Sequence, residues 1–161
     1  MQLEGIDPPA PRPDRLPVQD LGVYERHGGH TLRKHVDTRP GDELRRILRE
    51  GIAAAGRFLN RGVAQRCVER VIGDHTSEIR NWLAGPEAEV PFTCAQQMGQ
   101  MIGRYLTWDD VAHGMVHPKP ASAVRVVLRR RPELPGGFTV VTAYPTRAPR
   151  RRPHQVRSQR S

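Results

Sequence analysis

Apolar positions in the first half of the chain follow a helical period. Between residues 42 and 59 they recur every three to four positions on one stripe, and Asp42 can cap the N-terminus of that helix. A second stripe runs from about residue 62 to 83. Gly73-Asp74 permits a break within it, and Gly85-Pro86 ends it. The pattern predicts two amphipathic helices.

The last third of the chain changes to a strand-like pattern. AVRVVLRRR at 123–131 and GGFTVVTAYP at 136–145 are rich in β-branched residues. PELPGG lies between them and supplies the residues of a turn. We expect two antiparallel strands here. Because helices come first and strands last, the order indicates an α+β fold.

Two other segments show no sustained period. Residues 21–44 are rich in Gly and His, which favours a short strand or turn followed by a loop. Residues 91–120 contain glycines among scattered apolar positions, and we expect loops with a short helix or strand there.

The two ends of the chain differ in composition from the middle. Residues 1–20 contain five prolines and no basic start followed by an apolar run, so we expect a disordered leader or linker and no signal peptide. Residues 146–161 carry six arginines and no acid, and we expect a disordered tail. One domain is then expected at 21–145. No apolar run approaches the roughly 20 residues that span a bilayer, so we expect no transmembrane segment and no membrane insertion.

The net charge of +9 lies mostly in that tail, since the rest of the chain holds 20 bases against 17 acids. An arginine-rich tail raises the local concentration of any polyanion through contacts with phosphates. It can equally serve solubility, because 24 of the 26 basic residues along the whole chain are arginines. Charge alone therefore does not establish a nucleic-acid partner.

Cysteine and histidine limit the kinds of site that the chain can form. Two cysteines, Cys67 and Cys94, are too few for a disulfide framework and are expected to be buried thiols. His113 and His117 are four apart, but Gly114 and Pro118 argue against a helix that could present them to a metal. Asp109 is better explained as a helix cap than as a metal ligand. We expect no metal site and no cofactor.

Two segments carry side chains suited to chemistry on phosphate. His27, His30 and His35 lie within nine residues, and histidine has the pKa best suited to proton transfer near neutral pH. Thr142 and Tyr144 share one face of the last predicted strand, roughly 7 Å apart. Their hydroxyls can donate to a phosphate oxygen, or can simply mark a strand end that reaches solvent.

Three features together resemble a known family. They are GGHTLRKHV at 28–36, an arginine eleven residues after His35, and a last strand that ends in TAYP. The chain resembles, from about Leu21 to Pro145, the bacterial RNase A-like domain at the C-terminus of contact-dependent growth inhibition and other polymorphic toxins. The resemblance implies an RNase A-like fold, with N-terminal helices followed by a curved antiparallel sheet and no disulfide framework. Where the family has a Gly-Lys type of turn, this chain has Asp37-Thr38-Arg39-Pro40.

The resemblance also implies a catalytic set, which by position is His35, Arg46, Thr142 and Tyr144. A histidine can take the proton from the attacking 2′-OH, and an arginine can bind two oxygens of the phosphorane. The hydroxyls of the last strand would orient the phosphate. His30 or Tyr144 is the candidate for the second proton-transfer group.

The helical pattern leaves one of these assignments open. Arg46 points away from the centre of the apolar stripe on its helix, whereas Arg45 and Arg49 flank it. An active-site arginine must face a solvent cleft, so Arg46 is compatible with the role, and Arg45 and Arg49 remain substitutes.

The resemblance implies a metal-independent endoribonuclease that acts as an antibacterial toxin module in the cytosol of a target cell. Its expected partners are RNA and a cognate immunity protein, and we expect a monomer. The rival hypothesis is a non-catalytic, basic RNA-binding or scaffold protein with the same fold. RNA degradation that depends on His35 separates the two.

Overall fold

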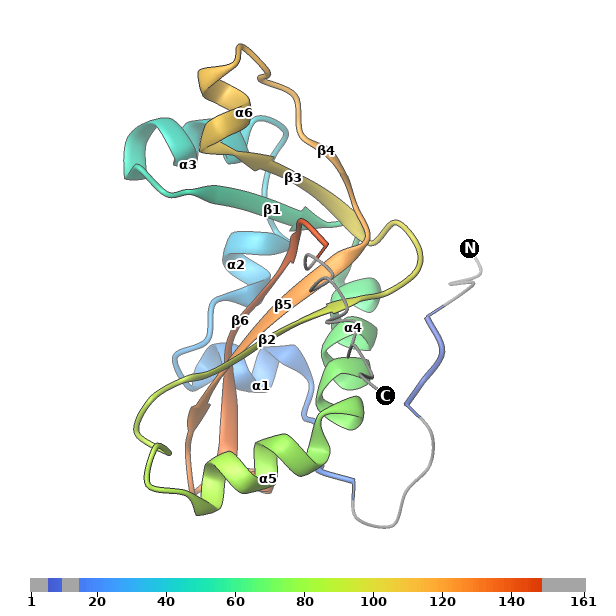
Figure 1. The fold of residues 1–161 in the computed structure, drawn as a ribbon, viewed down its shortest axis with the longest axis vertical. Helices are drawn as coiled ribbons and strands as arrows, with labels where there is room; N and C mark the ends of the chain where they lie inside the picture. Colours follow the sequence, from blue (N-terminus) through green and yellow to red (C-terminus); the bar gives the residue numbers. More distant parts are fainter. Residues whose placement is uncertain (1–5, 10–14, 149–161) are drawn as a thin grey trace, which may run out of the picture.

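Two antiparallel sheets and a set of short helices form the described part of this computed structural model, residues 6–9 and 15–148. Figure 1 shows the elements in chain order, from α1 in blue to β6 in red. The helices are α1 (Leu21–Arg26), α2 (Thr31–His35), α3 (Asp42–Glu50), α4 (Arg61–Asp74), α5 (Thr76–Ala84) and α6 (Trp108–Ala112), with a 3₁₀ turn η1 (Pro135–Gly137). The strands are β1 (Ala54–Phe58), β2 (Phe92–Gln97), β3 (Gly103–Thr107), β4 (Lys119–Ala121), β5 (Ala123–Arg130) and β6 (Phe138–Thr146).

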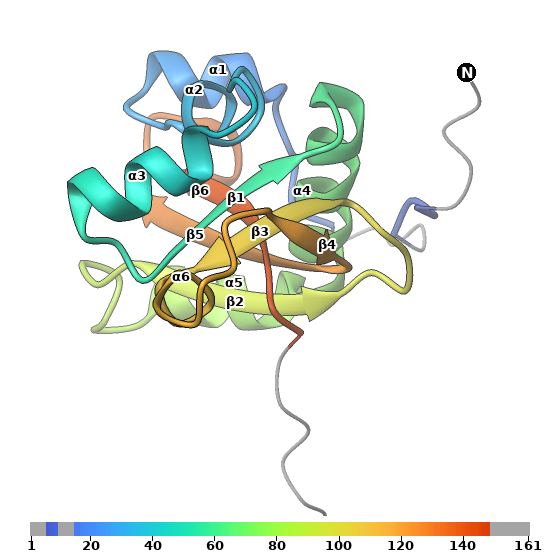
Figure 2. The ribbon, with the colours of Figure 1, turned by 90° about the horizontal axis from the view of Figure 1, so that it is seen from above.

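The strands form two three-stranded sheets. One has the order β2-β5-β6 and the other β1-β3-β4, and all recorded pairs are antiparallel. Figure 1 shows β1 and β3 crossing above the end of the β2-β5-β6 sheet, with α3 and α6 beyond them. In the view from above, α1 and α2 lie to one side of β6 (Figure 2). This is the expected α+β class, and the two strands predicted at 123–131 and 136–145 are confirmed as β5 and β6.

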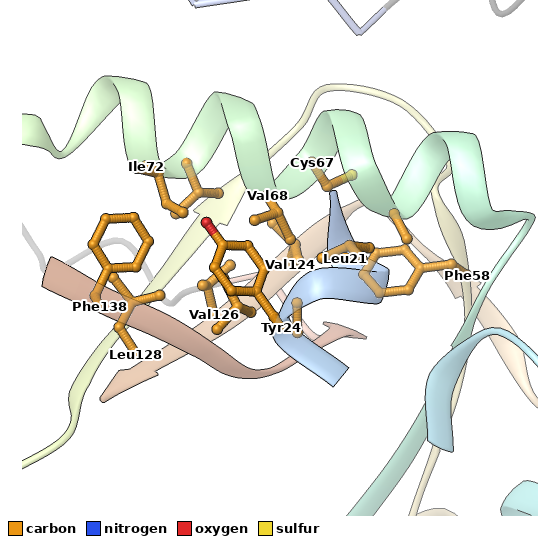
Figure 3. Packing of buried hydrophobic residues seen from close by; sticks show 14 of the residues in the cluster. Leu21, Tyr24, Phe58, Cys67, Val68, Ile72, Val124, Val126, Leu128 and Phe138 are labelled. Carbon is orange, nitrogen blue, oxygen red and sulfur yellow. The ribbon is translucent and has the colours of Figure 1, made fainter. Parts of the chain in front are cut away.

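The main core lies between α4 and the β2-β5-β6 sheet. Val124, Val126 and Leu128 alternate along β5 and are almost fully buried, as strand periodicity requires. Helix α4 packs Cys67 and Val68 against the same cluster (Figure 3). Because every second residue of β5 faces this core, the intervening residues face the opposite side of the sheet.

The helix predicted over residues 42–59 is confirmed in its first part, as α3, and is wrong in its second part. It ends at Glu50, where Gly51 caps it in the left-handed conformation with φ of 65°. Residues 54–58 then form β1, which pairs with β3. The apolar positions at 52–59 continue the helical spacing of the preceding residues, so spacing alone did not reveal the strand, which forms by pairing with β3.

The turn and loop expected over residues 21–44 are also wrong, because α1 and α2 form there. Asp20 caps α1 by accepting a hydrogen bond from the Gly22 N–H at 2.8 Å. Helix α2 is held by other parts of the chain, since Thr31 Oγ1 accepts from the Ala143 N–H at 3.0 Å. Helices of five and six residues are too short to show a period in sequence.

The helix predicted over residues 62–83 is found as two, α4 and α5, which meet at His75. The permitted break at Gly73-Asp74 is therefore displaced by one residue, and the end before Gly85 is confirmed. The loops expected over 91–120 contain β2, β3, α6 and β4.

The described part of the Pro-rich leader packs against the domain. Ile6 and Leu16 belong to the main core cluster, and Arg70 Nη1 donates to the Asp7 carbonyl at 3.2 Å. The expected disorder of residues 1–5, 10–14 and 149–161 concerns positions outside the described residues. None of the described helices is both long enough and apolar enough to cross a membrane.

The two cysteines are free, with Cys67 buried and Cys94 half-buried. Burial raises the pKa of Cys67 to about 12 and is the main reason that the pKa of Cys94 rises to about 11. Both thiols therefore stay protonated and unreactive at neutral pH.

Candidate active site

His35 is the last residue of α2, and its side chain is buried with 5% of its surface exposed. Its Nδ1 atom lies 2.8 Å from the carbonyl oxygen of Gly56 in β1. A carbonyl can only accept a hydrogen bond, so Nδ1 carries the proton and donates it. The other ring nitrogen, Nε2, then keeps its lone pair in the neutral ring. The contact with Gly56 thus fixes the tautomer that a general base requires.

Burial lowers the pKa of His35 to about 4. The hydrogen bond to Gly56 opposes this shift, and the charge of Arg46 adds to it. At neutral pH the ring is therefore uncharged, which makes His35 a proton acceptor and not a proton donor in the free protein.

Tyr144 lies next to His35, with 5.3 Å between the ring centroids. It comes from β6, the last strand. Burial raises the pKa of Tyr144, while the nearby charge of Arg125 lowers it. The phenol keeps its proton at neutral pH, so it is a hydrogen-bond donor beside the neutral imidazole.

His30 also lies near His35, with 6.3 Å between the ring centroids. It is the N-cap residue of α2, and its backbone N–H donates to the Val141 carbonyl of β6 at 2.9 Å. Burial lowers the pKa of His30, and Lys34, Arg33 and Arg46 lower it further. The site therefore has a positive potential that favours an anion.

Arg46 reaches this group from α3. Its charge lowers the pKa of both His30 and His35, and its side chain is 20% exposed. Its Nε lies 3.6 Å from Glu50 Oε2. Arg45, by contrast, contacts Asp42 and donates to the Pro40 carbonyl at 3.3 Å. The geometry thus favours Arg46 over Arg45 as the arginine of the site.

Thr142 lies on the same face of the sheet as Tyr144, because Val127 and Arg125 of β5 stand opposite them in register. Its side chain is 8% exposed, and its hydroxyl has no hydrogen-bond partner among the described residues. A buried hydroxyl without a partner costs free energy. The hydrogen-bonding capacity of this hydroxyl is thus unused by the described residues.

Gly56 allows the strand that holds His35 to pass close to the strand that carries Tyr144. A Cβ atom on Gly56 would lie 2.4 Å from the backbone oxygen of Pro145, so β1 can cross β6 at this level only with glycine there. Gly56 holds His35 through its carbonyl, and Pro145 directly follows Tyr144. The crossing thereby brings His35 and Tyr144 together.

Two of these features were not found by sequence reasoning. The Gly56 carbonyl carries no signal in sequence, because any residue has a carbonyl. Arg125 stands directly opposite Tyr144 and is exposed. The sequence signal for Arg125 was present, since it is the charged residue inside the apolar run AVRVVL.

The other histidines noted in the sequence lie apart from this group. His27 is exposed at the end of α1, and exposed His113 has its Nδ1 atom 2.8 Å from the Asp109 carbonyl. The cap of α6 is Thr107, not Asp109, because the Thr107 hydroxyl accepts from the N–H of the third helical residue. Within residues 6–9 and 15–148 no three His, Cys, Asp or Glu side chains gather as a metal site.

Comparison with known proteins gives two matches. Residues 29–145 match the family model described as the bacterial CdiA-CT RNase A domain. One similar solved chain occurs in the crystal structure of a CdiA-CT/CdiI complex from Y. kristensenii 33638, with a TM-score of 0.64 and 23% identity over 73% of this chain and 99% of that chain. At this identity the likeness shows the fold. No protein with a curated description matches the chain.

Proposed function

The chain belongs to the family of bacterial CdiA-CT RNase A domains, and from that premise we propose that it is a metal-independent endoribonuclease that cuts RNA through the neighbouring 2′-OH. The match confirms the resemblance inferred from the sequence, and it makes the chain an antibacterial ribonuclease toxin domain of the contact-dependent growth inhibition type. The single observation that carries the proposed mechanism is the buried, neutral His35, whose protonated Nδ1 leaves Nε2 as a base beside Tyr144.

The first step is attack of the 2′-oxygen on phosphorus. His35 Nε2 takes the proton of the 2′-OH while the 2′-oxygen forms its bond to phosphorus. The bond between phosphorus and the 5′-oxygen then breaks, and that oxygen receives a proton. The products are a 2′,3′-cyclic phosphate on one fragment and a 5′-hydroxyl on the other. The substrate supplies its own nucleophile, so the step requires no activated water.

Charge on the non-bridging oxygens grows during this step. Arg46 carries a permanent charge and can bind two oxygens at once, so it stabilises the phosphorane. The unpartnered hydroxyl of Thr142 donates to one phosphate oxygen and orients it. Tyr144 or His30 returns a proton to the leaving 5′-oxygen, since each has its ring beside His35.

The proposal extends to partners and to the ends of the chain. The solved relative from Y. kristensenii is recorded in a complex with CdiI. By that likeness we infer that a cognate immunity protein neutralises this chain, which acts as a monomer in the cytosol of the target cell. The Pro-rich leader and the arginine-rich tail flank the catalytic domain at 21–145, and the tail adds affinity for RNA that does not depend on the RNA sequence.

Incubation of the purified protein with total RNA tests the proposal. We expect degradation that persists in EDTA and is lost in His35→Ala. The rival, a scaffold that binds RNA without cutting it, predicts RNA retention with no new fragments from either protein. Loss of all cleavage in EDTA would show that the reaction depends on a metal and would overturn the mechanism.

A further inference from the structure

A basic cavity of about 370 Å³ opens between α2 and α3, next to the candidate active site. Five cationic side chains, two carboxylates and Thr38 line it. We call it the α2–α3 pocket. Arg46 belongs both to this pocket and to the group around His35, so the two sites adjoin.

The positive charge of the pocket is only partly neutralised. Asp42 contacts Arg45, and Glu50 lies 3.6 Å from Arg46. The other three cations, Arg33, Lys34 and Arg49, form no ion pair with a described residue. Like charges held together in this way repel one another unless an anion joins them.

Two further observations point to the anion. Thr38 lines the pocket with a buried hydroxyl that has no hydrogen-bond partner in the described part of the chain. In addition, Arg33 and Lys34 act electrostatically on His30, which places their positive charge within range of the candidate catalytic rings. A bound anion would therefore receive a hydroxyl donor as well as charge, and it would lie beside the reacting phosphate.

We propose that the α2–α3 pocket binds a backbone phosphate of RNA next to the phosphate that is cut. The inference rests on the proposed function and deepens it, because it assigns a subsite that acts in binding and not in bond breaking. Arg33 and Arg49 supply the charge, and the Thr38 hydroxyl donates to a phosphate oxygen. A substrate with a single phosphodiester fills only the catalytic position and cannot use the pocket.

Binding of uncleavable 2′-O-methyl RNA tests the subsite. The variant is Arg33→Gln/Arg49→Gln, since both side chains are exposed and neither has an ion pair with a described residue. The matched control, Arg66→Gln/Arg129→Gln, removes the same charge from exposed positions on α4 and β5. Fluorescence anisotropy at several salt concentrations gives the dissociation constant of a pentanucleotide and of a dinucleotide.

We expect the pocket variant to bind the pentanucleotide about tenfold more weakly, and its salt slope to fall by about 0.7, the value for one lost phosphate contact on a single strand. Dinucleotide binding should not change, and the control should match the wild type for both ligands. Equal losses for the two ligands, equal losses in the control, or unchanged pentanucleotide binding would each overturn the subsite. These ligands cannot be cut, so the experiment measures binding alone. A wild-type protein that does not cleave RNA would refute the proposed function, but it would not change the outcome of this test of the subsite.

Discussion

The imidazole of His35 and the phenol of Tyr144 lie 5.3 Å apart between ring centroids, although one belongs to α2 and the other to the last strand. Both are at least half-buried, and burial acts on them in opposite senses. It lowers the pKa of His35 and raises that of Tyr144, so one ring is ready to accept a proton while the other still holds its own. This pairing supports acid-base chemistry at a phosphate between the two elements.

The pH dependence of cleavage should show the low pKa of His35. The free protein has a pKa of about 4 at this residue, so the base form persists well into the acid range. We expect the acid limb of kcat/KM for a short RNA to fall near pH 4, because kcat/KM reports the free enzyme. A limb near the ordinary histidine value of about 6.5 would contradict the burial of an uncharged ring.

The stability of the fold should depend on the same group. His35 has a pKa of about 4 when folded, below the ordinary value of 6.5, so the unfolded chain binds more protons between these values. The contribution of the uncharged His35 ring to the free energy of unfolding is therefore fully present above about pH 6.5 and is lost as the pH falls through about 4. We expect the free energy of unfolding to drop between pH 7 and 4 by up to about 3 kcal/mol more in the wild type than in His35→Gln. Urea unfolding at both pH values measures this difference, and equal drops would refute it.

Arg46 should matter far more than its neighbour. Arg46→Ala should lower kcat/KM by about 10²–10³-fold if the guanidinium stabilises the developing charge. Arg46→Lys should recover only part of this loss, because an ammonium cannot bind two oxygens in one plane. Arg45→Ala is the control, measured on a dinucleotide because Arg45 also lines the α2–α3 pocket, which a single phosphodiester cannot use. Arg45 contacts Asp42, and its charge is not among those acting on either histidine. A larger loss in Arg45→Ala would move the role to that residue.

A change of leaving group should identify the residue that donates the second proton. Tyr144→Phe and His30→Ala are compared on RNA and on a uridine 3′-phosphodiester with a p-nitrophenyl leaving group, which departs without protonation. The variant that lacks the donor should be slow on RNA and near wild type on the activated ester. His35→Ala should stay slow on both, because the 2′-OH must still lose its proton. If neither donor variant regains activity on the ester, neither residue is the general acid.

The sequence pattern predicted the parts of the fold whose character is set by local sequence. Strands β5 and β6 were found because both runs are rich in β-branched residues and PELPGG separates them. The strand at Ala54–Phe58 was missed, since its burial depends on pairing with β3, which lies far along the chain. Helix α2 was missed because its order comes from contacts such as Ala143 N–H to Thr31 Oγ1, which no local pattern contains.

The features of the candidate site likewise divide into those that the sequence predicted and those that only the structure shows. His35, Arg46, Thr142 and Tyr144 came from motifs, and the structure places the rings of His35 and Tyr144 together with the charge of Arg46 acting on His35. The partner of His35 could not be predicted, because the Gly56 carbonyl reaches it only through the crossing of β1 and β6. The position of Arg125 opposite Tyr144 depends on a register shift between Val127 and Leu128. No pattern in the sequence indicates this shift.

The most direct test of the central claim uses a DNA oligonucleotide with one ribonucleotide in its middle. Attack by the 2′-OH can occur only at the phosphodiester that follows this ribonucleotide, whatever else the protein binds. In the presence of EDTA we expect the wild type to make a single cut there and leave a 2′,3′-cyclic phosphate, which mass spectrometry distinguishes from a linear phosphate. His35→Ala should leave the strand intact. Cuts between deoxynucleotides, a 3′-hydroxyl end, or equal cleavage by His35→Ala would contradict the account.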